Sequence, residues 1–123
     1  MVRLLIVDDD LPTCDFLRLF FEKREYQVFT AQSGAKALAV VEEKHPNVIL
    51  LDIKMPDMSG IEVLRKTKEI DGEVKIIMMT GVKEEVVIEL TKEYGAIEYI
   101  TKPFSLEHLE KDVMPKVLRQ LVV

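Results

Sequence analysis

The sequence predicts an α/β fold with a doubly wound parallel sheet, and three observations support it. Five short apolar runs are separated by amphipathic stretches of helical length. Each run ends at charged or turn-forming residues, and the spacing between runs is that of one strand plus one helix. No linker or shift in composition divides the 123 residues. We therefore expect one domain over residues 1–123, built from five consecutive βα units.

The first unit starts with the apolar run Leu4–Val7, which predicts a strand that stops at the acidic residues 8–10. Pro12 suits the first turn of the following helix, and Asp10 is the expected N-cap of that helix. The helix is predicted to bury one face, which carries Leu17, Phe20 and Phe21.

The second strand, Tyr26–Ala31, has mixed polarity, which is typical of an edge strand. A helix then opens at Ser33 and Gly34 and cannot continue past Pro46. The third run, Val48–Leu51, is uniformly apolar and predicts a strand buried on both faces. The helix after it carries Ile61, Val63, Leu64 and Ile70, and it ends at the turn Asp71-Gly72.

The last two units follow the same scheme. Val74–Met79 predicts the fourth strand and Lys83–Tyr94 the fourth helix, with Gly95 placed to stop it. Ile97–Ile100 predicts the fifth strand. Ser105 is a good cap for a final helix through Leu106, Leu109, Val113 and Leu118, which Pro115 should kink or break.

Composition excludes several classes of function. The net charge of −5, without a basic cluster, argues against a direct nucleic-acid partner. The apolar runs are too short to span a membrane, and the N-terminus lacks the pattern of a signal peptide. Cys14 is the single cysteine, so no internal disulfide can form, which fits a reducing compartment. We expect a cytoplasmic protein without a membrane partner.

Unusual polar residues follow the predicted strands at their carboxyl ends. Asp8 and Asp9 follow the first strand, and Asp52 ends the third. If the strand order is 2-1-3-4-5, the first and third strands are neighbours at the switch point, where a crevice opens. Two carboxylates about 4 Å apart repel by about 4 kcal/mol at an effective dielectric constant near 20. An oxygen-only cluster of this kind favours Mg²⁺, with Mn²⁺ as a substitute.

Two further residues at this edge complete the predicted chemistry. Thr80 ends the fourth strand, and Lys102 follows the fifth. An acyl phosphate on Asp52 needs a metal on one oxygen, an ammonium on another, and a hydroxyl and an N–H group on a third. Lys102 can supply the ammonium, Thr80 the hydroxyl, and the backbone of Gly81 the N–H group.

These residues stand in motifs that resemble the receiver domain of bacterial two-component response regulators, which has a flavodoxin-like (βα)5 fold. The likeness covers nearly the whole chain, and it rests on five motifs in order with matching spacing. They are Val7-Asp8-Asp9, Leu51-Asp52, Met55-Pro56 through Gly60, Thr80-Gly81, and Gly95-Ala96 with Tyr99 and Lys102-Pro103-Phe104.

The resemblance implies a phosphorylation-dependent signalling switch that catalyses its own phosphorylation. Asp52 would accept a phosphoryl group from the phosphohistidine of a sensor histidine kinase. Mg²⁺ would be bound by Asp9, Asp52 and the backbone carbonyl of Lys54, and by Asp8 mostly through water. Lys102 would bind the phosphoryl group. The resemblance also implies a cis bond before Pro103 and a switch made of Thr80 and Tyr99.

The output of such a switch is less determined by the sequence. The expected partner face is formed by the fourth helix, the fifth strand and the fifth helix, where the run Val86-Val87-Ile88 should leave one apolar side chain outward. A downstream target protein or a histidine phosphotransferase would dock there. The chain reads as a natural single-domain regulator or as a receiver excised from a longer protein, with a faint likeness to sporulation-type relay regulators.

Other interpretations remain open at this point. A degenerate receiver could act as a binding module without phosphate, although the intact acidic, hydroxyl and ammonium residues argue against it. A flavin-binding electron carrier shares this topology, but the turn after the first strand is acidic where a flavin phosphate needs donors. Lys54 and Val82 border the expected path of the hydrolytic water and offer no group to position it, so we expect slow self-dephosphorylation.

Overall fold

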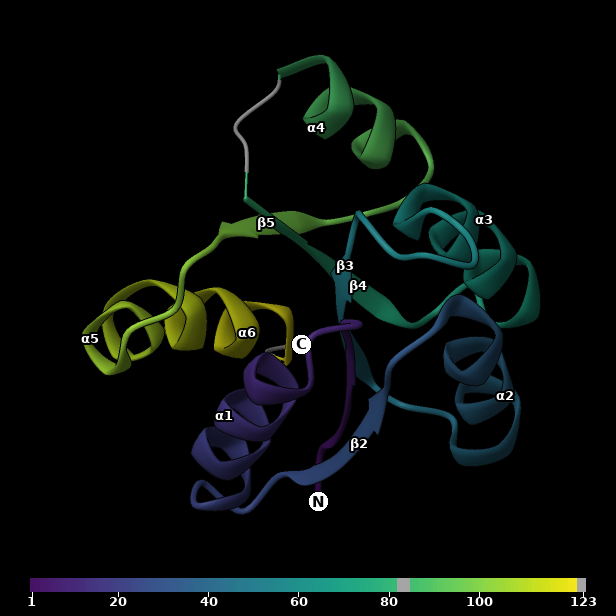
Figure 1. The fold of residues 1–123 in the computed structure, drawn as a ribbon. Helices are drawn as coiled ribbons and strands as arrows, with labels where there is room; N and C mark the ends of the chain where they lie inside the picture. The colour runs from purple at the N-terminus through teal and green to yellow at the C-terminus, as the bar shows by residue number, and fades with distance from the viewer. Residues whose placement is uncertain (82–84, 122–123) are drawn as a thin grey trace.

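The computed structural model describes residues 1–81 and 85–121. Its five strands form one parallel sheet in the order β2-β1-β3-β4-β5, as the sequence predicts (Figure 1). The strands are β1 (Arg3–Val7), β2 (Gln27–Ala31), β3 (Val48–Asp52), β4 (Lys75–Thr80) and β5 (Glu98–Thr101). Each predicted strand is present, with its boundaries shifted by about one residue.

Helices cover both faces of the sheet. The segments are α1 (Leu11–Glu22), α2 (Gly34–Lys44), α3 (Gly60–Ile70), α4 (Glu85–Glu93), α5 (Leu106–His108), the π-helical turn η1 (Leu109–Val113) and α6 (Met114–Leu121). Figure 1 shows α1 on the same side of the sheet as α5 and α6, and α2 and α3 on the other side. Among the described residues, no helix combines the length and apolar character needed to cross a bilayer.

The central strands divide their side chains between two cores, one on each side of the sheet. Leu4 and Ile6 of β1 pack with α1 and the last helix, whereas Leu5 and Val7 pack with α2 and α3. Every residue of β3 is buried. The alternation of β1 follows from the two-residue period of a strand, and it explains why β1 and β3 read as continuous apolar runs.

Local sequence signals begin and end the helices as predicted. The Asp10 side chain accepts a hydrogen bond from the N–H of Thr13 and caps α1, and Ser33 and Ser105 cap α2 and α5 in the same way. Gly95 follows α4 with a φ of 105°, a conformation that strains any residue with a Cβ. These short polar and flexible residues set the lengths of the helices that support the sheet.

Of the two effects predicted for Pro115, a kink or a break of the last helix, the break does not occur, but regular α-helical geometry is interrupted just before it. The helix continues through Pro115 because residues 109–113 form a π-helical turn, in which the N–H of Met114 donates to the carbonyl of Leu109. Proline lacks the N–H that would bond to Lys111, and its ring crowds that carbonyl in a regular α-helix. The wider π-helical turn before Pro115 accommodates both effects within one continuous helix.

Candidate functional site

The carboxyl ends of the parallel strands meet at one edge of the sheet and surround a pocket. Asp52 is the last residue of β3 and lies opposite Met79 of β4, and Thr80 lies opposite Thr101 of β5. The backbone N–H of Lys102 donates to the carbonyl of Thr80. The pocket has a volume of about 330 Å³ and is lined by Asp9, Asp52, Ile53, Lys54, Thr80, Gly81, Val87 and Lys102. The pocket therefore includes most of the sequence-predicted residues, whereas Asp8 and Tyr99 are not among those that line it.

Three carboxylates converge at this edge with different degrees of burial. Asp8 is fully buried and Asp52 is 6% exposed, whereas Asp9 is exposed. One oxygen of each of the three side chains lies within 4.8 Å of the others. Asp8 is held by its neighbours, because its Oδ1 accepts a bond from the N–H of Asp10 and its carbonyl accepts one from the Cys14 thiol. The predicted clustering of carboxylates is therefore present.

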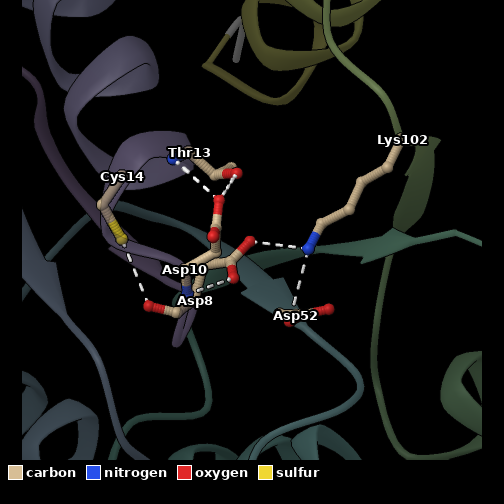
Figure 2. Close-up of polar contacts among 6 residues, drawn as sticks. All are labelled: Asp8, Asp10, Thr13, Cys14, Asp52 and Lys102. Atoms are coloured by element: carbon tan, nitrogen blue, oxygen red, sulfur yellow. Dashed lines mark hydrogen bonds and ion pairs between the residues drawn. The ribbon is translucent and has the colours of Figure 1, made fainter.

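Lys102 places its ammonium between two of these carboxylates. Its Nζ lies 2.7 Å from Asp8 Oδ2 and 3.3 Å from Asp52 Oδ2, and Figure 2 shows the side chain reaching across from the end of β5. The side chain of Lys102 is 25% exposed, so these contacts are shielded from solvent. The peptide bond from Lys102 to Pro103 is cis, as the resemblance implies.

Burial and charge perturb the acidity of this cluster. Burial and, to a lesser extent, the negative charge of Asp8 raise the pKa of Asp52 to about 6 against the opposing effect of Lys102. Burial alone lowers the pKa of the Lys102 ammonium, but the contacts with Asp8 and Asp52 outweigh it, so that this pKa is raised. Lys102 stays protonated at neutral pH, yet one ammonium does not offset the charge around Asp52.

The residues present fit a hard divalent cation. The three side chains offer only carboxylate oxygens, which are the donors that Mg²⁺ prefers. Burial and the charge of Asp8 disfavour the ionised form of Asp52, and a cation bound beside it would favour that form. An oxygen-only donor set with a deficit of positive charge is suited to Mg²⁺ and less suited to softer metals.

The loop after β3 is packed tightly against the end of that strand. The N–H of Gly60 donates to the carbonyl of Ile53 at 2.7 Å, and this bond closes the loop at its base. A Cβ at Gly60 would lie 2.1 Å from the backbone oxygen of Asp52, so only glycine fits there. Within this loop Lys54 is exposed and is one of the residues that line the pocket.

Thr80 and Tyr99 occupy different settings. Thr80 is 6% exposed and lines the pocket together with Gly81. Tyr99 is half-buried on β5 and pairs in register with Met78. Lys116 donates to the Tyr99 carbonyl at 3.0 Å, and its Nζ lies 5.2 Å from the centre of the Tyr99 ring. Val82, which we expect to affect hydrolysis, lies outside the described residues.

Two residues near the site make contacts that sequence reasoning did not predict. Val87 of α4 lines the pocket, although its sequence pattern indicates only an apolar helix position. Asp57 binds backbone amides of α2 through its carboxylate. No local signal could reveal that contact, because the two segments are 23 residues apart in sequence.

Comparison with known proteins decides the family. The model of the response regulator receiver domain matches residues 4–114. The chain belongs to this family. Receiver domains act in phosphorylation-dependent signalling, and the fold and acidic cluster of this receiver agree with that activity.

The relatives of this receiver support the same assignment. It is 39% identical over 116 residues to the sporulation initiation phosphotransferase F of Bacillus subtilis, covering 94% of this chain and 93% of that protein. A CheY-like receiver domain protein from Methanospirillum hungatei is 34% identical, with a TM-score of 0.88 over 98% of this chain and 97% of that one. CheY in the CheX–CheY–BeF3–Mg²⁺ complex from Borrelia burgdorferi is 27% identical, with a TM-score of 0.91 over 99% and 90%.

Proposed function

We propose that this receiver accepts a phosphoryl group on Asp52 from the phosphohistidine of a sensor histidine kinase, with Mg²⁺ bound beside the acceptor. The observation that carries the proposal is the convergence of three carboxylates and one ammonium at one edge of the sheet, where Asp9, Asp52 and Lys102 line the pocket. The Bacillus relative is described as a phosphotransferase, and the Borrelia complex contains BeF3 and Mg²⁺. Both descriptions agree with phosphoryl chemistry at this edge of the sheet.

The proposed metal ligands are Asp9, Asp52 and the backbone carbonyl of Lys54, with Asp8 acting mainly through water. Bound Mg²⁺ would neutralise charge on the acceptor and on the phosphoryl oxygens. Mn²⁺ has the same preference for oxygen ligands and is the expected substitute.

The side chains of this receiver account for the remaining chemistry. One oxygen of Asp52 forms a bond to phosphorus while the bond from phosphorus to the donor imidazole breaks, and the electron pair stays on that nitrogen. Lys102 would move from its carboxylate partners to a phosphoryl oxygen, and the Thr80 hydroxyl and Gly81 N–H would donate to another. Movement of Thr80 toward the phosphoryl group would then let the Tyr99 ring turn inward.

The decisive experiment measures mass. The receiver is incubated with acetyl phosphate and Mg²⁺, and its intact mass is compared with that of Asp52→Asn. We expect a gain of one phosphoryl group in the wild type, no gain in the variant, and no gain in EDTA. An active donor that leaves the wild type unmodified in Mg²⁺ would falsify the proposal.

The proposal extends to the architecture and the partners. Receiver domains interact with histidine kinases or phosphotransferases, and we propose that residues 1–123 form one such domain acting in the cytoplasm. The face formed by α4, β5 and the last helix is the proposed docking surface for a downstream target or a histidine phosphotransferase. Val86 of α4 is 79% exposed, so an apolar side chain is available there.

A substitution on this face tests the partner surface. Val86→Glu should leave Mg²⁺-dependent phosphorylation of the receiver unchanged, because Val86 is not among the residues that line the pocket. The same variant should reduce phosphoryl relay from the receiver to purified histidine phosphotransferases. Unchanged relay would place the docking surface on another face.

A further inference from the structure

We propose that Asp57 is a positioning residue for the metal site, because its carboxylate fixes the β3–α3 loop, residues 53–59, to the start of α2. Gly34 N–H donates to Asp57 Oδ1 at 2.9 Å, and Ala35 N–H donates to Asp57 Oδ2 at 3.1 Å. This inference rests on the proposed function, since the same loop carries Lys54, whose carbonyl is a proposed Mg²⁺ ligand. Asp57 itself does not line the pocket.

The bonds of Asp57 are separate from the local cap of α2. Ser33 caps that helix through its own hydroxyl, which accepts a bond from the N–H of Lys36 at 3.2 Å. Asp57 takes the two preceding amides, which would otherwise lack a partner within the helix. An anion at a helix N-terminus is also favoured by the helix dipole. The bonds from Gly34 and Ala35 accordingly lower the pKa of Asp57, so the carboxylate stays ionised at neutral pH.

An apolar contact supports the same attachment of the loop. A Cβ at Gly34 would lie 2.3 Å from Cγ of Met58, so Met58 packs directly against the backbone at the start of α2. The loop is closed at its base by the bond from Gly60 to Ile53. Asp57 and Met58 therefore hold the middle of the loop, and Gly60 holds its end.

Release of this attachment should weaken Mg²⁺ affinity more than it disturbs the position of Asp52. Asp52 lies within β3 and pairs with Met79 of β4, so the sheet holds its backbone. The backbone of Lys54, in contrast, lies in the loop, where its N–H donates to the Asp52 carboxylate. Loss of residues that orient metal ligands commonly weakens metal affinity by about 10- to 100-fold. Asp57 holds the loop and not the ligand itself, so we expect a loss of about tenfold, at the lower end of this range.

The test compares Mg²⁺ dissociation constants, measured by NMR titration at constant pH and ionic strength. Asp57→Ala should weaken binding about tenfold. Asp57→Asn keeps one oxygen acceptor and should give a smaller loss. Ser33→Ala is the matched control, because it removes a cap from the same helix without touching the loop. Glu62→Gln is a second control, because it removes an exposed carboxylate from α3.

The two controls distinguish positioning of the loop from effects of helix stability and of net charge. Equal loss of affinity in Asp57→Ala and Ser33→Ala would mean that helix stability is the cause, and equal loss in Glu62→Gln would mean that net charge is the cause. Either outcome overturns the proposal, as does an Asp57→Ala affinity within twofold of the wild type. A wild type that binds no Mg²⁺ would instead refute the proposed function.

Hydrogen exchange provides a readout that needs no metal. In EDTA, Asp57→Ala should speed exchange of the Gly34 and Ala35 amides and of the loop amides from Ile53 to Ser59. Ser33→Ala should speed exchange within α2 alone. Unchanged loop exchange in Asp57→Ala would show that the carboxylate does not hold the loop, and it would overturn the proposal even if metal affinity fell.

Discussion

Asp52→Asn should make the metal-free receiver more stable, even though it removes the proposed acceptor. Burial and the charge of Asp8 raise the pKa of Asp52 from 3.8 to about 6. Each pKa unit corresponds to about 1.4 kcal/mol, so ionised Asp52 destabilises the folded state by about 3 kcal/mol at pH 7.5. Asparagine has nearly the same shape and no charge. The variant should therefore gain roughly 2 to 3 kcal/mol, or at least about 5 °C in Tm.

The contribution of Asp52 to the stability of the folded state decreases as the pH rises. The folded state holds the proton of Asp52 more tightly than the unfolded state, because the folded pKa is the higher of the two. This contribution to stability is therefore complete below about pH 4 and is lost as the pH rises through about 6. The difference in Tm between Asp52→Asn and the wild type should be large at pH 7.5 and should shrink toward pH 5.

The assay is thermal unfolding followed by circular dichroism in EDTA at pH 5.0, 6.0 and 7.5. Asp15→Asn is the charge-matched control, because Asp15 forms only an exposed ion pair with Arg18 and should change stability by less than about 1 kcal/mol. Added Mg²⁺ should raise the Tm of the wild type more than that of Asp52→Asn. A variant no more stable than the wild type at pH 7.5, or an advantage independent of pH, would refute this reasoning.

Three further predictions concern the same edge of the sheet. Asp9→Asn should weaken Mg²⁺ binding yet raise the metal-free Tm, because it removes one charge from the cluster; a lower Tm would show that the repulsion is negligible. Gly60→Ala should cost about 1–3 kcal/mol in urea unfolding, because its Cβ meets the Asp52 carbonyl, and equal stability would refute that packing. The phosphoaspartate should last far longer than seconds, and Lys54→Asn should shorten its lifetime in a mass-based decay measurement; a wild-type lifetime of seconds would contradict the role given to Lys54.

The sheet was predictable because its signals are local. Each strand is a compact apolar run, and the carboxyl ends of parallel strands must share an edge, so the convergence of Asp8, Asp52 and Thr80 follows from strand order alone. The caps at Asp10 and Ser33 are equally local, since each side chain bonds an amide three residues away.

Other features were not predictable, because they depend on contacts or conformations that leave no signal in the local sequence. The attachment of Asp57 to α2 joins segments that are 23 residues apart in sequence. The position of the Lys102 ammonium between two carboxylates depends on the rotamer of a long side chain. The passage of the last helix through Pro115 depends on a π-helical turn, and helix propensities do not indicate which backbone pattern accommodates a proline.

The net charge of the acidic cluster and Lys102 favours a divalent cation over a monovalent one. When ionised, the side chains of Asp8, Asp9, Asp52 and Lys102 leave two negative charges. One divalent cation cancels them, whereas Na⁺ or K⁺ leaves a charge in place. In the proposed reaction, phosphorylation would replace the single charge of the Asp52 carboxylate with the double charge of an acyl phosphate, and Lys102 would meet that charge together with the bound divalent cation. In the unphosphorylated receiver, the Lys102 ammonium lies between Asp8 and Asp52, and the proposed reaction would draw it from these carboxylates to the phosphoryl group.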